Sequence, residues 1–148
     1  MTKKAWGNEY RTTTVCIDSY ENSVPKGRFY NRYLPEGKTF QSVTQFLLKM
    51  EQTLDDMDFP KAYTTTRTFA SPVEYETGPP GPEFRMGDEA TFTIRVLFRQ
   101  NASWQGSVTW VEGKQEQSFR SVLELLFLMD SAAAAMEMRN DTIQNFRW

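Results

Sequence analysis

The sequence predicts an α+β fold: an antiparallel sheet of about four to six strands, with two helices on one face and pseudo-twofold symmetry. The first observation is an internal repeat, because one short segment recurs at a constant offset of 79 residues. The recurring residues are Phe40, Ser42, Val43, Leu47 and Met50, which return as Phe119, Ser121, Val122, Leu126 and Met129. Such a repeat predicts two copies of one strand-turn-strand-helix unit, related by a pseudo-twofold axis.

The second observation is a matching strand pattern in each half. Residues 12–20 and 90–100 alternate apolar and polar positions and are rich in threonine and β-branched residues, which predicts strands. After turns at residues 22–26 and 101–103, second strands are expected over 27–34 and 104–111. Further turns are expected around Pro35-Glu36-Gly37-Lys38 and Glu112-Gly113-Lys114.

The third observation is a helix start signal at the same place in both halves. Ser42 with Gln45, and Ser121 with Glu124, fit the capping box, in which we expect the Gln45 side chain to return to the Ser42 N–H. Each start is followed by an apolar stripe at helical spacing. The stripes are Val43, Phe46, Leu47, Met50, Leu54 and Met57, then Val122, Leu125, Leu126, Met129, Ala133 and Met136. The alanine-rich residues 131–139 should extend the second helix.

These patterns predict one domain, because 148 residues are enough to bury a single core. The expected parts are a first repeat (10–60), a connection (61–88), a second repeat (89–139) and a tail (140–148) within one domain over 1–148. The connection contains a threonine-rich segment, 63–69, expected to form an extra strand, and a Pro/Gly-rich linker over 71–88. The sequence Gly-Pro-Pro-Gly-Pro in it resembles a docking ligand, but a plain linker is favoured. Trp148 is a candidate contact residue.

Composition excludes several classes of protein. The net charge of −2 offers no general attraction to nucleic acids, so any such site must be local. A single cysteine, Cys16, rules out an internal disulfide and favours a reducing, cytoplasmic location. No signal-like segment or membrane-spanning apolar run is found, so no membrane association is expected.

Catalytic constellations are largely excluded because the chain has no histidine. The phosphate-binding glycine loops and calcium loops are absent from the sequence, and one cysteine cannot build a zinc site. Asp55, Asp56 and Asp58 form an acidic cluster that fits magnesium, although an exposed acidic face is the favoured interpretation. Cys16 is expected to be an inert thiol. We therefore expect no enzyme activity, no cofactor and no metal.

The open face of the sheet is the candidate binding surface. We expect Phe92, Ile94, Val96 and Phe98 to face the helices, which leaves the alternate positions outside. The candidate binding residues are Arg28, Tyr30, Arg32, Arg95, Arg99, Gln105 and Thr109. Arginine interleaved with tyrosine is typical of single-strand nucleic-acid binders, but also of protein interfaces, and a normally solvated sheet face is the simplest interpretation.

The segments 98–110 and 117–125 carry a resemblance to a known group of proteins. With Gly27-Arg28-Phe29-Tyr30-Asn31 and Leu34-Pro35-Glu36-Gly37-Lys38, they resemble small uncharacterised proteins of gut Firmicutes carried on conjugative or other mobile elements. The resemblance implies a genetic context and no mechanism. At the level of fold, the repeated unit resembles half of the PC4/Whirly-like single-strand binders, which carries no function by itself.

Together these points predict a non-catalytic binding protein of a mobile element. One concrete form is an inhibitor of a host defence nuclease, such as an anti-CRISPR protein, acting through protein–protein contacts with a nuclease effector. The alternative is single-stranded nucleic-acid binding on the open sheet face. A magnesium-dependent enzyme using Asp55 and Asp56 is a third class, and a homodimer is compatible with all of them.

Overall fold

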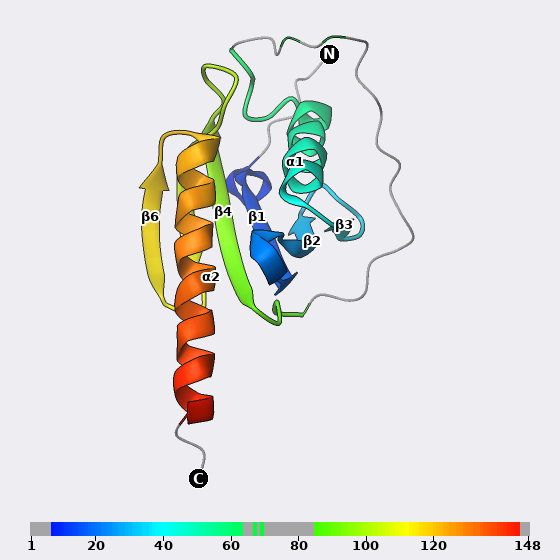
Figure 1. Cartoon of the computed structure of the whole chain (residues 1–148). Helices are drawn as coiled ribbons and strands as arrows, with labels where there is room; N and C mark the ends of the chain where they lie inside the picture. The colour runs from blue at the N-terminus through cyan, green and yellow to red at the C-terminus, as the bar shows by residue number, and fades with distance from the viewer. Residues whose placement is uncertain (1–6, 64–66, 68, 70–84, 146–148) are drawn as a thin grey trace.

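The computed structural model describes residues 7–63, 67, 69 and 85–145, with the backbone alone for residue 8 and for 137–145. Strands and helices follow one another in the order strand, strand, strand, helix, and this order occurs twice (Figure 1). The elements are η1 (Asn8–Arg11), β1 (Thr12–Ser19), η2 (Glu21–Ser23), β2 (Lys26–Asn31), β3 (Lys38–Phe40), α1 (Val43–Met57), β4 (Ala90–Phe98), β5 (Gln105–Trp110), β6 (Gln115–Phe119) and α2 (Val122–Asn145).

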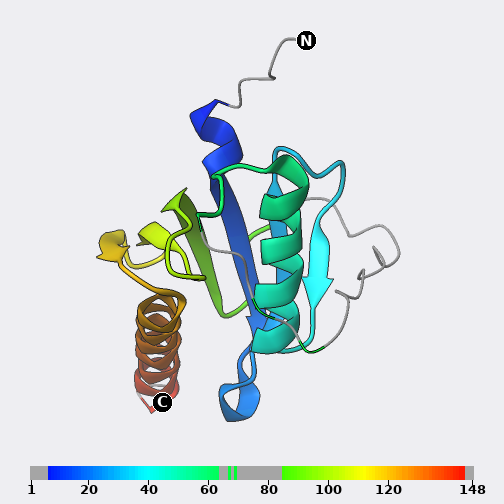
Figure 2. The same cartoon turned by 90° about the horizontal axis from the view of Figure 1, so that it is seen from above.

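The strands form one six-stranded antiparallel sheet in the order β3-β2-β1-β4-β5-β6. Both helices lie on the same face of this sheet, as the view from above shows (Figure 2). Helix α1 packs against β3, and α2 packs against β4, β5 and β6. The predicted α+β class, with an antiparallel sheet and two helices on one face, is confirmed.

Two strands were missed by the sequence analysis, which predicted only turns before each helix. Strand β3 is three residues long, and β6 carries polar side chains on both faces, so neither has an alternating pattern. Strands β2 and β5 begin 79 residues apart, at Lys26 and Gln105, in line with the repeat offset. A shared order of elements does not demonstrate common descent, so the duplication stays a prediction.

Each half contains a β-bulge at the same place. The register of β1 with β2 shifts between Ile17 and Ser19, and that of β4 with β5 shifts between Val96 and Phe98. A glycine on the neighbouring strand lies beside each bulge. A Cβ on Gly27 or Gly106 would lie 1.9 Å from a carbonyl oxygen of the facing strand, so only glycine allows the strands to approach this closely.

Both helices begin at the predicted capping serine. The Ser42 Oγ accepts a hydrogen bond from the Gln45 N–H, and the Ser121 Oγ accepts one from the Glu124 N–H, both at 3.1 Å. The return bond differs from the prediction. The Gln45 side chain accepts from the N–H of Gln41, one residue before the cap, instead of from Ser42. Helix α2 continues to Asn145, beyond the predicted extension to Arg139.

The core lies between the sheet and the two helices. Between α1 and the β2–β3 side of the sheet the core is aromatic, since Phe29, Phe40 and Phe46 pack ring against ring. From the predicted stripes, Met50, Leu54, Leu125 and Met129 are also buried. Val43, Leu47, Val122 and Leu126 are only half-buried.

Part of the predicted connection lies outside the described residues. This applies to most of the expected strand over 63–69 and to most of the linker over 71–88, including its Gly-Pro-Pro-Gly-Pro segment, and also to Trp148. Next to it, Ala62 makes a single parallel bridge with Arg99 at the end of β4.

Substituting Gly106→Ala should destabilise the protein by about 3 kcal/mol, because the new methyl group meets backbone that cannot rotate away. The free energy of unfolding in urea measures this, with Ser107→Ala on the same strand as the control, which should cost less than about 1 kcal/mol. An equal effect of the two substitutions would show that the close approach does not constrain β5.

Candidate functional site

The seven candidate binding residues do not form one surface. Arg28 and Arg99 are buried, with 3% and 2% of their surface exposed. Arg32 and Arg95 are exposed, and the half-buried candidates are Tyr30, Gln105 and Thr109. On the open face, Thr109 pairs with Thr93, which pairs with Thr14 next to Tyr30, so a row of hydroxyl groups crosses the strands.

The prediction that Arg99 lies on the open face is wrong, and the β4 bulge is the reason. Leu97 has no partner on β5, so the alternation of side chains shifts by one residue after Val96. Phe98, expected in the core, is therefore 53% exposed, and Arg99 turns towards the helices.

Arg99 forms ion pairs with two carboxylates of helix α1. Its Nη1 donates to Glu51 Oε1 at 2.9 Å and to Asp55 Oδ1 at 2.7 Å, and its Nε donates to the Pro60 carbonyl. The second Glu51 oxygen accepts a hydrogen bond from the Trp104 indole. Asp55 is thus used in an ion pair, and no group of three or more metal-ligating side chains converges in the part of the chain that the structure describes.

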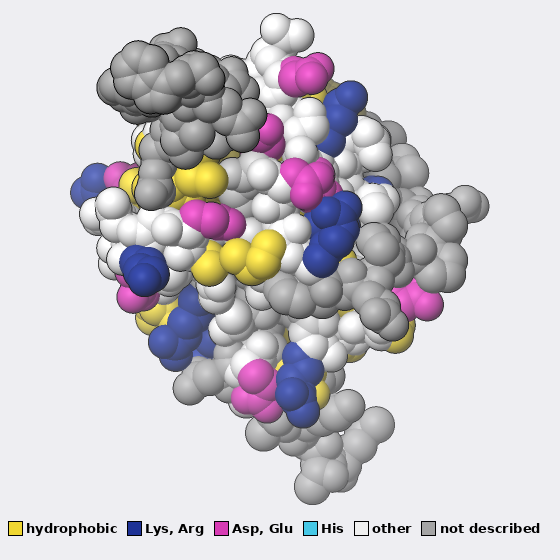
Figure 3. Space-filling view, turned by 90° about the horizontal axis from the view of Figure 1, so that it is seen from below, with side chains coloured by type: hydrophobic (Ala, Val, Ile, Leu, Met, Phe, Trp, Pro, Cys, Tyr) yellow, Lys and Arg dark blue, Asp and Glu magenta, His cyan; other side chains and the backbone are white. Residues whose placement is uncertain are grey.

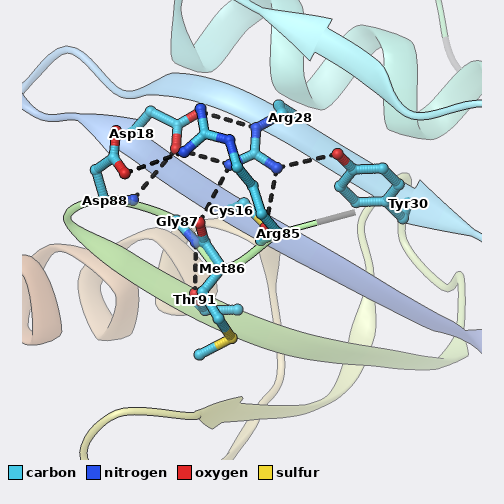
Figure 4. Close-up of polar contacts among 9 residues, drawn as sticks. All are labelled: Cys16, Asp18, Arg28, Tyr30, Arg85, Met86, Gly87, Asp88 and Thr91. Carbon is cyan, nitrogen blue, oxygen red and sulfur yellow. Dashed lines mark hydrogen bonds and ion pairs between the residues drawn. The ribbon is translucent and has the colours of Figure 1, made fainter. Parts of the chain in front are cut away.

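Arg28 lies on the open face but is covered by the segment before β4 (Figure 4). Its guanidinium binds both oxygens of Asp18 at 2.9 Å and donates to the Tyr30 hydroxyl at 3.0 Å. It also donates to the carbonyl oxygens of Arg85 and Met86. Arg28 therefore anchors the segment just before β4, at Arg85 and Met86. Its guanidinium is not accessible to a ligand.

The ion pair shifts both pKa values. Burial acts to raise the pKa of Asp18, but the hydrogen bonds from Arg28 and from the Asp88 N–H outweigh it, so the pKa lies below its ordinary value. The bond to Asp18 raises the pKa of Arg28. Beside them, burial raises the pKa of the Cys16 thiol, whose Sγ donates to the Arg85 carbonyl at 3.3 Å. Cys16 is completely buried, in line with an unreactive thiol.

A hollow with an apolar lining lies between the two helices, a feature that the sequence analysis missed. This groove has a volume of about 300 Å³, with Ile17 and Phe92 of the sheet at its floor. Val43 and Phe46 of α1 line one side, and residues of α2 line the other. Tyr20 and Asp130 close one end, where the Tyr20 hydroxyl donates to Asp130 Oδ1.

Helix α2 exposes large apolar side chains beside this groove. Leu123 is 60% exposed and Phe127, one turn further on, is 65% exposed, and both line the groove. Since Leu125 and Met129 are buried on the opposite side, residues 125–129 of α2 are apolar all round. A helix segment of this kind is normally buried on every side, so its free face stands out as an exposed apolar patch. The run from Leu123 to Met129 is the sequence signal that could have found it.

Neither positive nor negative side chains predominate on the face of the molecule that is seen from below. Seen from below, lysine and arginine side chains lie among aspartate and glutamate side chains and leave no area of one sign (Figure 3). The side chains visible on this face therefore offer little attraction to a phosphate backbone.

No protein-family model matches the chain, and no curated protein or solved structure matches it either. Fold and site therefore rest on the sequence and the structure, and the resemblance to proteins of mobile elements stays a prediction. None of the helices within the described residues is both long and apolar enough to cross a membrane.

Stability should fall in acid because of Asp18. Its pKa is lower in the folded than in the unfolded chain, so the pair with Arg28 contributes fully above about pH 4 and is lost as the pH falls further. Asp18→Asn should cost about 3 kcal/mol at neutral pH, since it leaves the buried Arg28 charge unpaired, and should flatten the acid limb.

Denaturant unfolding at a series of pH values from about pH 7 down to about pH 3 measures both effects. Asp88→Asn is the control, because its partner Arg85 is exposed and such surface pairs contribute little. The same pH dependence in Asp18→Asn and in the unchanged protein would contradict the assignment.

Proposed function

We propose that this protein is a non-catalytic binding protein that contacts a partner protein through the groove between α1 and α2. The observation that carries the proposal is the pair Leu123 and Phe127, which are both more than half exposed beside an apolar hollow. Burial of large apolar side chains against a partner stabilises the complex, because it removes them from water. Contiguous exposed apolar patches are typical of interaction sites.

A more specific form of the proposal is inhibition of a host defence nuclease, as an anti-CRISPR protein does. It is supported by the resemblance to proteins of mobile elements and by the mild net negative charge, −2, which suits a basic nuclease surface. In this form the protein occupies a surface that the nuclease needs, and performs no chemistry itself.

Single-stranded nucleic-acid binding on the open face is the second candidate. Exposed Arg32 and Arg95 and the exposed ring of Phe98 favour it, since arginine holds phosphates and aromatic rings stack on bases. It is the weaker candidate, because Arg28 and Arg99 are held in ion pairs and are not available to a ligand.

The double substitution Leu123→Ser and Phe127→Ser should weaken partner binding while leaving the fold intact, because both side chains are largely exposed. The experiment compares proteins captured from lysates of candidate hosts by the unchanged and the substituted protein, then repeats the binding with the purified partner or nuclease. We expect at least about a tenfold weaker interaction, as is common for losing interface anchors.

Leu48→Ser is the matched control, since Leu48 is 42% exposed on α1 but does not line the groove. A partner retained equally by the double variant would refute a role for the groove. Salt-sensitive binding of labelled single-stranded DNA that is lost in Arg32→Ala with Arg95→Ala would instead support the second candidate.

A further inference from the structure

The two helices are each tied to a strand end of the opposite half by equivalent contacts. Arg99 follows β4 and binds Glu51 of α1, and Tyr20 follows β1 and binds Asp130 of α2. Tyr20 and Arg99 are separated by the repeat offset of 79 residues, and so are Glu51 and Asp130. The β1 and β4 bulges, which precede Tyr20 and Arg99, turn both side chains towards the helices.

At the Arg99 end, the space between the helices and the sheet is filled by an indole. Trp104 lies directly before β5, is 3% exposed and belongs to the hydrophobic core. Glu51 uses one carboxylate oxygen for Arg99 and the other, Oε2, for the Trp104 N–H. The carboxylate therefore fixes a cation and an indole at once.

At the Tyr20 end, the corresponding space is open. Pro25, which lies directly before β2, occupies the position that Trp104 has in the other half, and it lines the groove of about 300 Å³. Ala133 lines it where Leu54 stands in the other half, so a smaller side chain leaves room here too. Asp130 accepts from Tyr20 through Oδ1, and its Oδ2 takes no hydrogen bond from any residue that the structure describes.

We propose that the groove accepts a tryptophan side chain of the partner protein, with the indole N–H donating to Asp130 Oδ2. The proposal rests on the proposed function and names the chemistry of its partner. The Trp104 site supplies the precedent within the same molecule: a carboxylate on the helix, apolar walls and a buried indole. Tryptophan combines a large apolar area with one hydrogen-bond donor, and it is among the commonest anchors of protein interfaces.

The two tryptophans that the structure describes do not occupy this groove. Trp104 is buried at its own site beside Glu51, and Trp110 lies in β5 and does not line the groove. We therefore assign the groove to an indole of another chain.

The test uses the full chain and N-acetyl-L-tryptophanamide as the probe, followed by amide chemical shifts in NMR titrations. The matched control ligand is its 1-methylindole derivative, which keeps the ring but has no N–H to donate. We expect shifts at groove residues and about tenfold weaker binding of the methylated ligand, the ratio for one lost hydrogen bond to a charged acceptor. Equal affinities, or shifts away from the groove, would overturn the proposal.

Two substitutions make the test specific to the groove. Ala133→Leu copies Leu54 of the other half and should reduce probe binding at least about tenfold by filling the space. Asp130→Ala should make the two ligands bind equally, because it removes the acceptor. Asp56→Ala, which removes an exposed acid of α1 outside the groove, should change neither affinity. Probe binding unaffected by Ala133→Leu would overturn the proposal.

The outcomes separate this inference from the proposed function. If Leu123 and Phe127 are needed to capture a partner but the probe does not bind, the function stands and the tryptophan assignment is wrong. If the probe binds in the groove but the double variant captures every partner, the function is wrong. Concentration-dependent dimers in sedimentation that vanish in Trp148→Phe would assign the groove to a second copy and overturn a partner protein.

Discussion

The buried guanidinium of Arg99 is the interaction on which the arrangement of helices and sheet depends. Leaving a buried arginine without partners is strongly unfavourable, so α1 must present Glu51 and Asp55 to the end of β4. The bulge at Leu97 makes this contact geometrically available, because it turns Arg99 to the helix face. A local change in strand register thus determines which helix is held by the end of β4, a central strand of the sheet.

Within the described residues, the space beside the helices is filled at the Arg99 end and open at the Tyr20 end. At the Arg99 end, Trp104 completes the packing and donates to the carboxylate that holds Arg99. At the Tyr20 end, proline stands in place of tryptophan, so the hollow between the helices stays open and Asp130 keeps a free oxygen within the described structure. The groove is therefore the point at which two otherwise matching ends differ, and α2 lines it with the exposed side chains Leu123 and Phe127.

Periodicity and capping chemistry predicted what is local. The serine caps and apolar stripes placed both helices, and threonine-rich alternation placed β1 and β4, because these signals lie within one element. The short polar strands β3 and β6 could not be predicted, since pairing with a neighbour alone makes them strands. The face of the sheet on which Arg99 lies depends on Leu97, which has no partner on β5. Strict alternation of side chains therefore predicted the wrong face for Arg99. The groove is lined by residues that are far apart in the sequence, near positions 20, 43 and 127. It could not be predicted because only the folded chain brings them together.

The central claim is that the groove and the Trp104 site are two versions of one indole site. A crystal structure of the Pro25→Trp variant tests it most directly, because this substitution places an indole where the other half has one. The account predicts that the introduced ring fills the groove and that its N–H donates to Asp130 Oδ2. An indole lying in solvent above a groove that is still open would contradict the account.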